Sequence, residues 1–465
     1  MKLPPILLCA FALALAAVGC GREAELALGD LPAGGRGPAG ATVLRVPREG
    51  GTPRLYRVPG LDSSSWKAED KLPALQRTVG ADPELGLVFF LDRKRNVVAL
   101  DLETRRVRNH LEQVRQAAVG PDGSLYAVDT GGVVTQLVRR APVRFRSKLQ
   151  GSAEELRATM GGSLIARIEG RSPALEVLGS DQPPEILPTP PGPVSTTLWG
   201  DLAAVTADSA VLIYETGAEQ TRRSIPVAGH ARAALFSPSG HRIYVARDEL
   251  GLLVLDRFSG GELFTIELPG PARELRSDPY GQWLLVRPSA GDSAWVVDVG
   301  SSRFTGTVAV EWDEDLPALV PPGTLLTRRE SDLVALDLGS QGFPVRARIE
   351  GGARDTWLPL AWHPAQDAGP TVEADSALLA VDPDSASGGS VFLQVSSSQN
   401  PSWANELSQR LQAAGLPASV LEPRRSDEAY RVVLGPYTTR EQAEETGRRI
   451  GMPSFIVTAQ DAPPR

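Results

Sequence analysis

The chain has little cysteine, histidine or methionine and no excess of positive charge. Its 465 residues include 2 Cys, 4 His and 3 Met, and the formal net charge is −8. An acidic balance gives no electrostatic footprint for nucleic acid or for anionic lipid. The histidines, His110, His230, His241 and His363, do not recur at any common spacing. We therefore expect no metal, no cofactor and no nucleic-acid partner.

The N-terminus predicts a targeting signal. The apolar run Ile6 to Val18 has about 13 residues, whereas a membrane-spanning helix needs about 20. The run ends in AVGC, which resembles a bacterial lipobox and implies lipidation of Cys20 after loss of residues 1–19. Cys9 would be lost with them, so Cys20 would be the only thiol and would have no disulfide partner. Gly21 after it implies an outer-membrane lipoprotein facing the periplasm; a plain secretory peptide is the alternative.

A repeat follows a tether. Residues 20–40 are rich in Gly, Pro and Ala and predict a flexible segment. From 41 to 383, Gly-, Pro- and Asp-containing turns recur about every 40 residues, and apolar strands such as LVFFLD, SLYAVD and RIYVAR follow them. Four short strands per period of this length are typical of a β-propeller blade. The region resembles the broad WD40, YVTN and lactonase-like propellers, without a regular Trp-Asp signature.

Eight turn sites predict eight blades, with seven as the alternative if Leu358 to Asp382 is linker. Only seven of the sites are followed by a third and a fourth strand. We expect Thr42 to Val58 to supply the missing pair and to complete a last blade. Its inner strands would be Leu358 to Trp362 and Ala377 to Val381. Such closure removes the exposed edge of an open ring.

The propeller offers few candidate catalytic groups. Asp82, Asp122, Asp278 and His363 lie in turns between first and second strands, where a metal site is conceivable, but such residues are usually chosen for turn geometry. The aspartates that end second and third strands have the same interpretation. We predict no catalytic residue here, although two carboxylates far apart in the chain could still form a glycosidase site.

The composition changes after a linker at residues 384–389. Residues 390–460 predict a small α+β domain of order βαββαβ, followed by a tail at 461–465. The predicted strands are Ser390 to Ser396, Pro417 to Glu422, Ala429 to Gly435 and Pro453 to Thr458. The predicted helices are Pro401 to Ala414, whose apolar residues recur at four-residue spacing, and a second helix that is capped by Thr438 or Thr439 and continues through Ile450.

The runs VFLQVSSSQNPSWANELSQRLQAAGLPASVLE and AYRVVLGPYTTREQAEETGRRIGMPSFIVTA resemble the two halves of a SPOR domain. The resemblance implies binding to peptidoglycan glycan strands that lack stem peptides. Alternation along the strands assigns Leu393, Val395, Tyr430, Val432 and Leu434 to the helix-covered face. The predicted glycan-binding residues, on the open face and at its rim, are Phe392, Gln394, Ser396, Arg431, Val433, Gly435, Pro436 and Tyr437.

RNA-binding domains share this topology but stack bases on exposed aromatic residues. Phe392 is the only aromatic expected on the open face, and residues 390–460 contain seven basic and seven acidic residues. We therefore reject RNA. The sequence favours a lipid-anchored envelope protein that binds peptidoglycan and presents its propeller to a protein partner, in cell division or envelope maintenance. The alternative is a periplasmic propeller enzyme, lactonase-like or glycan-acting, targeted by the same C-terminal domain.

Overall fold

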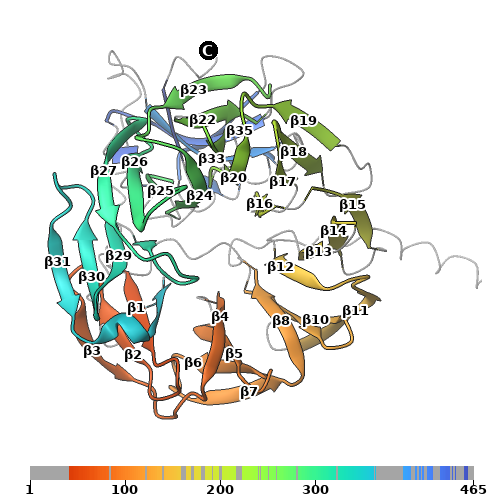
Figure 1. The fold of residues 1–465 in the computed structure, drawn as a ribbon, viewed down its shortest axis with the longest axis vertical. Coiled ribbons are helices and arrows are strands. Elements are labelled where there is room, and N and C mark those ends of the chain that lie inside the picture. Colours follow the sequence, from red (N-terminus) through yellow and green to blue (C-terminus); the bar gives the residue numbers. More distant parts are fainter. Residues whose placement is uncertain are drawn as a thin grey trace, which may run out of the picture.

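Two folded regions make up the chain in the computed structural model. The structure describes residues 41–362 and 391–458, apart from short gaps within each range. The predicted signal peptide, Cys20, the tether and the linker lie outside the described residues. Within the described part there are nine four-stranded antiparallel sheets, of which eight stand around a central channel and form a propeller (Figure 1). The prediction of eight blades is confirmed.

Seven blades are built from strands consecutive in sequence. The first three are β4 (Leu75–Asp82), β5 (Leu87–Asp92), β6 (Val97–Asp101) and β7 (Val107–Leu111); β8 (Val114–Val119), β9 (Leu125–Asp129), β10 (Val133–Val138) and β11 (Ala141–Lys148); and β12 (Ala153–Ala158), β13 (Leu164–Ile168), β14 (Ala174–Leu178) and β15 (Glu185–Pro188). The fourth and fifth are β16 (Val194–Thr196), β17 (Leu202–Ala207), β18 (Ala210–Glu215) and β19 (Arg222–Pro226); and β20 (Ala231–Phe236), β21 (Arg242–Arg247), β22 (Leu252–Asp256) and β23 (Glu262–Ile266). The sixth and seventh are β24 (Ala272–Ser277), β25 (Trp283–Pro288), β26 (Ser293–Asp298) and β27 (Arg303–Ala309); and β28 (Ala318–Val320), β29 (Thr324–Arg329), β30 (Asp332–Asp337) and β31 (Val345–Ile349). In the blades whose first strand is labelled, β4, β8, β12, β16, β20 and β24, that strand lies nearest the centre of the ring (Figure 1).

The eighth blade joins the two ends of the propeller. It contains β32 (Thr356–Leu360), which follows the short 3-10 helix η2 (Gly352–Arg354), and then β1 (Thr42–Val46), β2 (Arg54–Arg57) and β3 (Asp62–Lys67). β1 pairs directly with β32, with Thr42 opposite Leu360 and Val46 opposite Thr356. Closure by the N-terminal segment is therefore confirmed, but the predicted division of two strands from each end is wrong. Since β1 occupies the second position, no place in this sheet remains for Ala377 to Val381, a segment outside the described residues.

Apolar contacts between neighbouring blades hold the ring together. The second and third strands are buried along their whole length in the first blade, whereas the outermost strand β7 has no buried residue. Leu285 and Val296 of the sixth blade pack with Leu325 and Val334 of the seventh, and all four are fully buried. Each such side chain contributes about 1.5–3 kcal/mol on burial. The strand faces between blades thus form a series of small cores around the ring.

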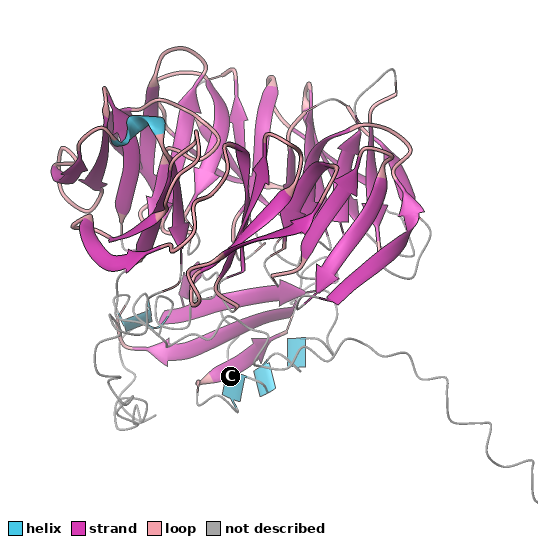
Figure 2. Cartoon of the chain, turned by 90° about the horizontal axis from the view of Figure 1, so that it is seen from below, coloured by secondary structure: helices cyan, strands magenta, loops and turns pink. Residues whose placement is uncertain are grey.

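The C-terminal region forms the ninth sheet, with the order β34-β35-β33-β36. Its strands are β33 (Val391–Ser398), β34 (Ala418–Leu421), β35 (Tyr430–Tyr437) and β36 (Phe455–Thr458). Helical residues lie between 404 and 412 and between 442 and 446, which confirms the predicted βαββαβ order. Figure 2 shows this small sheet beneath the propeller. No helix among the described residues is long and apolar enough to cross a membrane.

Candidate functional site

The small sheet has a helix-covered face. Leu393, Val432 and Leu434 are buried there with Ala404 and Leu411 of the first helical segment. Val395 belongs to the same core, and Tyr430 packs against its edge. The predicted assignment of these strand residues to the helix side is confirmed. The remaining strand positions therefore lie on the opposite face, where the sequence placed the glycan-binding residues.

Gln394 lies at the centre of that opposite face, paired with Val433 on β35. Both side chains are 0% exposed. Val433 clusters with Leu421 and Val457, and Phe392 packs against them, half-buried. The face was expected to be open, but its centre is covered. The atoms that cover it belong to this chain, because the exposures are those of a single molecule.

Among the residues that the structure describes, the Gln394 amide has no hydrogen-bond partner on either its oxygen or its nitrogen. An unsatisfied buried polar group costs about 1–3 kcal/mol. Such groups are rare in folded proteins, where most buried polar atoms are paired. The sheet face therefore carries a donor and an acceptor that no described residue pairs with.

Two bulges change the predicted alignment of the central strands. Gln394 pairs with Val433 but Ser396 pairs with Val432, so Val395 is an extra residue in β33. Val432 belongs to the helix-side core. Ser396 is therefore paired with a residue of the helix-covered face, whereas the prediction aligned it with residues of the open face. Arg431 pairs with Ser397 instead. A bulge inserts one residue and interrupts the two-residue alternation, which the sequence pattern assumed to be continuous.

The second bulge involves the Gly435–Pro436 segment, which lies opposite Phe392. Gly435 has a φ of 129°, and a Cβ there would meet the Val391 carbonyl oxygen at 3.1 Å and the Phe392 ring at 3.2 Å. Only glycine fits this close approach without strain. Pro436 is exposed at the rim. Tyr437 was expected to flank a glycan groove, but its side chain is 9% exposed and belongs to the helix-side core.

Two residues of the edge strands, Leu421 and Val457, belong to the apolar cluster on this face and were missed from the sequence. Val457 on β36 pairs with Phe392, and Phe455 pairs with Gln394. Leu421 on β34 pairs with Arg431. The predicted face included only the first and third strands of the domain, because these carry the clearest alternation. The order of strands in the sheet, which places β34 and β36 at its two edges, could not be predicted from alternation alone.

The family comparison agrees with this geometry. A family model described as "SPOR domain" matches residues 387–458. The C-terminal segment is a SPOR domain. A SPOR domain implies peptidoglycan binding, and such domains occur in proteins of the bacterial cell envelope. No curated protein matches the sequence.

Solved structures resemble the propeller. Apo AztD from Citrobacter koseri aligns with a TM-score of 0.51 and 11% identity, covering 69% of this chain and 99% of that chain. The dihydro-heme d1 dehydrogenase NirN in complex with DHE aligns with a TM-score of 0.48 and 15% identity, covering 70% of this chain and 79% of that chain. At these identities the similarity to AztD concerns the fold alone.

The turn aspartates of the propeller serve the backbone. Asp82 Oδ1 accepts the Leu85 N–H at 3.0 Å, and Asp278 Oδ1 accepts the Trp283 N–H at 2.7 Å. The aspartates that end third strands accept N–H groups two or three residues later, as Asp298 does from Gly300 at 2.9 Å. These hydrogen bonds confirm that Asp82, Asp278 and the aspartates at the ends of third strands stabilise turns. Asp122 and His363 lie outside the described residues. Among the described residues, no group of three His, Cys, Asp or Glu side chains could hold a metal ion.

Two of the innermost strands, β12 and β24, carry glutamates that have arginine partners. Glu155 lies 2.5 Å from Arg157, and Glu274 lies 3.0 Å from Arg276 and 2.8 Å from Arg287. In each of these ion pairs the glutamate charge and the arginine charge offset each other. Glu155 and Glu274 are therefore held in ion pairs.

Proposed function

We propose that this chain is a lipid-anchored envelope protein whose SPOR domain binds peptidoglycan glycan strands through the face centred on Gln394. The observation that carries the proposal is the unpaired, buried amide of Gln394 in a domain matched by the SPOR family model. Sugar hydroxyls can both donate and accept hydrogen bonds, so a glycan would satisfy the amide oxygen and nitrogen together.

The neighbours of Gln394 suit the same ligand. Phe392 and Val457 supply apolar area for the faces of sugar rings, and Arg431 adds charge-assisted donors at the edge of the face. Because Gln394 and Val433 are fully buried, binding requires that this face be uncovered first. In the covered state the Gln394 amide is unpaired, and a bound glycan would give it hydrogen bonds. These hydrogen bonds would offset part of the free energy needed to uncover the face.

We further propose that Cys20 carries the lipid, that the protein faces the periplasm from the outer membrane, and that the propeller binds a protein partner without catalysing a reaction. The pairing of the described inner-strand carboxylates with arginines supports the last point. A role in cell division or envelope maintenance is consistent with a chain held at both membrane and glycan.

The test is sedimentation of the full chain with amidase-treated sacculi, whose glycan strands lack stem peptides. We expect the wild-type chain to pellet and Gln394→Ala and Arg431→Ala to pellet at least several-fold less. Arg354→Ala removes the same charge from an exposed propeller residue and is the matched control. Equal pelleting of all four proteins would refute the face as the glycan site.

A further inference from the structure

The innermost strands of five blades share a bulge directly after their first residue. The pairing shifts between Leu75 and Arg77 in β4, and at the equivalent place in β8, β12, β20 and β24. The extra residues are Gln76, Arg115, Glu154, Arg232 and Arg273. Bulges re-aim side chains and are common at barrel rims and beside active sites. Here they place a polar residue at the same end of five of the eight inner strands.

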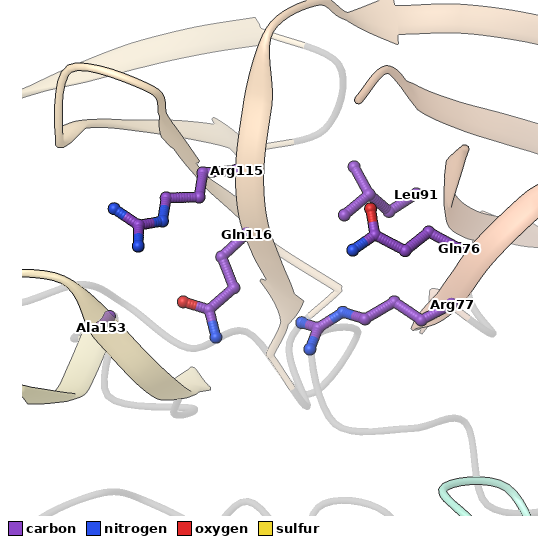
Figure 3. A pocket seen from close by; sticks show the side chains of 6 residues that line it. All are labelled: Gln76, Arg77, Leu91, Arg115, Gln116 and Ala153. Atoms are coloured by element: carbon purple, nitrogen blue, oxygen red, sulfur yellow. The ribbon is translucent and has the colours of Figure 1, made fainter. Parts of the chain in front are cut away.

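A pocket lies where the first two bulges meet. It has a volume of about 200 Å³ and is lined by Gln76, Arg77, Leu91, Arg115, Gln116 and Ala153. Figure 3 shows the Gln76 amide and the Arg77 guanidinium extending from β4 toward Gln116 on β8, with Arg115 on the side of Ala153. Four of the six lining side chains can donate hydrogen bonds, and none is a carboxylate.

The two arginines of this pocket make hydrogen bonds to neutral oxygens. Arg77 Nη2 donates to the Ala117 carbonyl at 2.8 Å, and Arg115 donates to the Ser152 hydroxyl. Gln116 Nε2 donates to the Glu154 carbonyl at 2.8 Å, which fixes its amide and leaves the amide oxygen to other partners. These contacts orient the donors without neutralising the guanidinium charges.

Other arginines of the innermost strands and their neighbours contrast with this pair. Arg232 donates to Asp248 at 2.8 Å, and Arg328 donates to Asp315 at 2.7 Å. The carboxylate nearest to Arg77 is that of Glu314, whose Oε1 lies 3.9 Å from Nη1, beyond hydrogen-bond distance. The Glu314 side chain is 63% exposed, so water weakens its attraction for Arg77. Positive charge at the pocket is therefore only partly balanced.

We propose that this pocket binds an oxyanion, a carboxylate or phosphate group carried by a small ligand. Guanidinium groups bind such groups with charge-assisted hydrogen bonds that are about twice as strong as neutral ones. The volume corresponds to roughly seven water molecules at ~30 Å³ each, so the bound part of the ligand is small. Glu314 competes weakly for Arg77 and gives way to the anion.

The test uses the full chain at low ionic strength with three probes: inorganic phosphate, lactate, and lactamide as the neutral counterpart of lactate. We expect phosphate or lactate to raise the unfolding temperature in a saturable way and lactamide to leave it unchanged. A response to phosphate alone identifies a phosphate-bearing ligand, and a response to lactate identifies a carboxylate. If neither anion acts more strongly than lactamide, the proposal is wrong.

Two substitutions at the pocket should change the anion affinity in opposite directions. Arg115→Met, at an exposed position, should weaken the anion affinity about tenfold, the effect of losing one charge-assisted bond of ~1.4 kcal/mol or more. Glu314→Gln should strengthen it several-fold, because it removes the competing charge. Arg93→Met, an equal charge change in the turn after β5, should have no effect. An Arg115→Met protein that binds as well as wild type would overturn the assignment.

Discussion

Arg328 donates from Nη2 to both carboxylate oxygens of Asp315, at 2.9 and 2.7 Å, and the two side chains are 5% and 8% exposed. The Asp315 carboxylate also accepts the backbone N–H of Trp357 at 2.8 Å, at the start of β32. The pair thus links the seventh blade to the strand on which the ring closes. Arg48, just after β1, reaches the same group of acids through Asp313 at 2.6 Å.

Arg328→Met should destabilise the propeller by up to about 3–5 kcal/mol, because it removes the closer charge partner of the buried Asp315 carboxylate and leaves only Arg48, whose Nη2 lies 3.4 Å away on a 40% exposed side chain. The measurement is chemical denaturation followed by tryptophan fluorescence, which reports on the buried Trp357. Arg93→Met, which breaks the exposed pair with Glu49, is the control and should leave the midpoint unchanged. Equal midpoints for Arg328→Met and wild type would contradict a role in closure.

Gln394→Leu should stabilise the SPOR domain while weakening glycan binding. Replacing an unpaired buried amide with an apolar group of similar size removes an unsatisfied polar group, for a gain of about 1 kcal/mol or more. Gln409→Leu, the same change at an exposed helical position, should leave both properties unchanged. Thermal unfolding and pelleting with amidase-treated sacculi measure the two effects. Loss of stability in Gln394→Leu would show that the amide is paired in solution.

His230 should titrate above the ordinary imidazole value. Its Nδ1 lies 2.5 Å from Asp208 Oδ1, and this hydrogen bond raises the pKa of His230 above 6.5. Since the folded-state pKa is the higher one, any stabilisation by the pair is complete below pH 6.5 and disappears as the pH rises through the folded value. NMR titration should show Asp208→Asn returning the pKa toward 6.5, with Asp62→Asn inert. A wild-type pKa at or below 6.5 would exclude the pairing.

Cys20→Ser should release the protein from membranes, because the acylated thiol is the predicted anchor. Fractionation of cells producing each form measures the change, with Cys9→Ser as the control that keeps the predicted lipidation residue. Retention of Cys20→Ser in the membrane fraction would count against lipidation.

The inner strands of the propeller could be predicted from the sequence, whereas its outer strands could not. LVFFLD became β5 because six consecutive buried residues give a strong apolar signal. β3, with the sequence DSSSWK, was missed, since an outermost strand faces solvent and carries only one buried residue, Trp66. Without β3, the sequence assigned β1 and β2 to the third and fourth places of the last blade, one place too far outward.

The same limit applies to the candidate glycan site. Alternation identified the correct face for Gln394 and Val433, because each pairs across the two central strands. It failed at Tyr437, which lies beyond the second bulge and belongs to the helix-side core. The first bulge interrupts the period between Gln394 and Ser396. Nor could it predict that the face would be covered, since alternation along a strand carries no information about what packs on either face.

The pairing of Thr42 with Leu360 has a mechanical consequence. The segment toward Cys20 and the segment toward the SPOR domain leave the propeller from the same end of one antiparallel strand pair. A chain held by lipid at one side and by glycan at the other would carry tension across this pair alone. Tension applied there separates the hydrogen bonds one after another, as in unzipping. Single-molecule pulling at residues 41 and 362 should therefore open the last blade at low force before the other seven; one simultaneous rupture of the whole ring would disprove it.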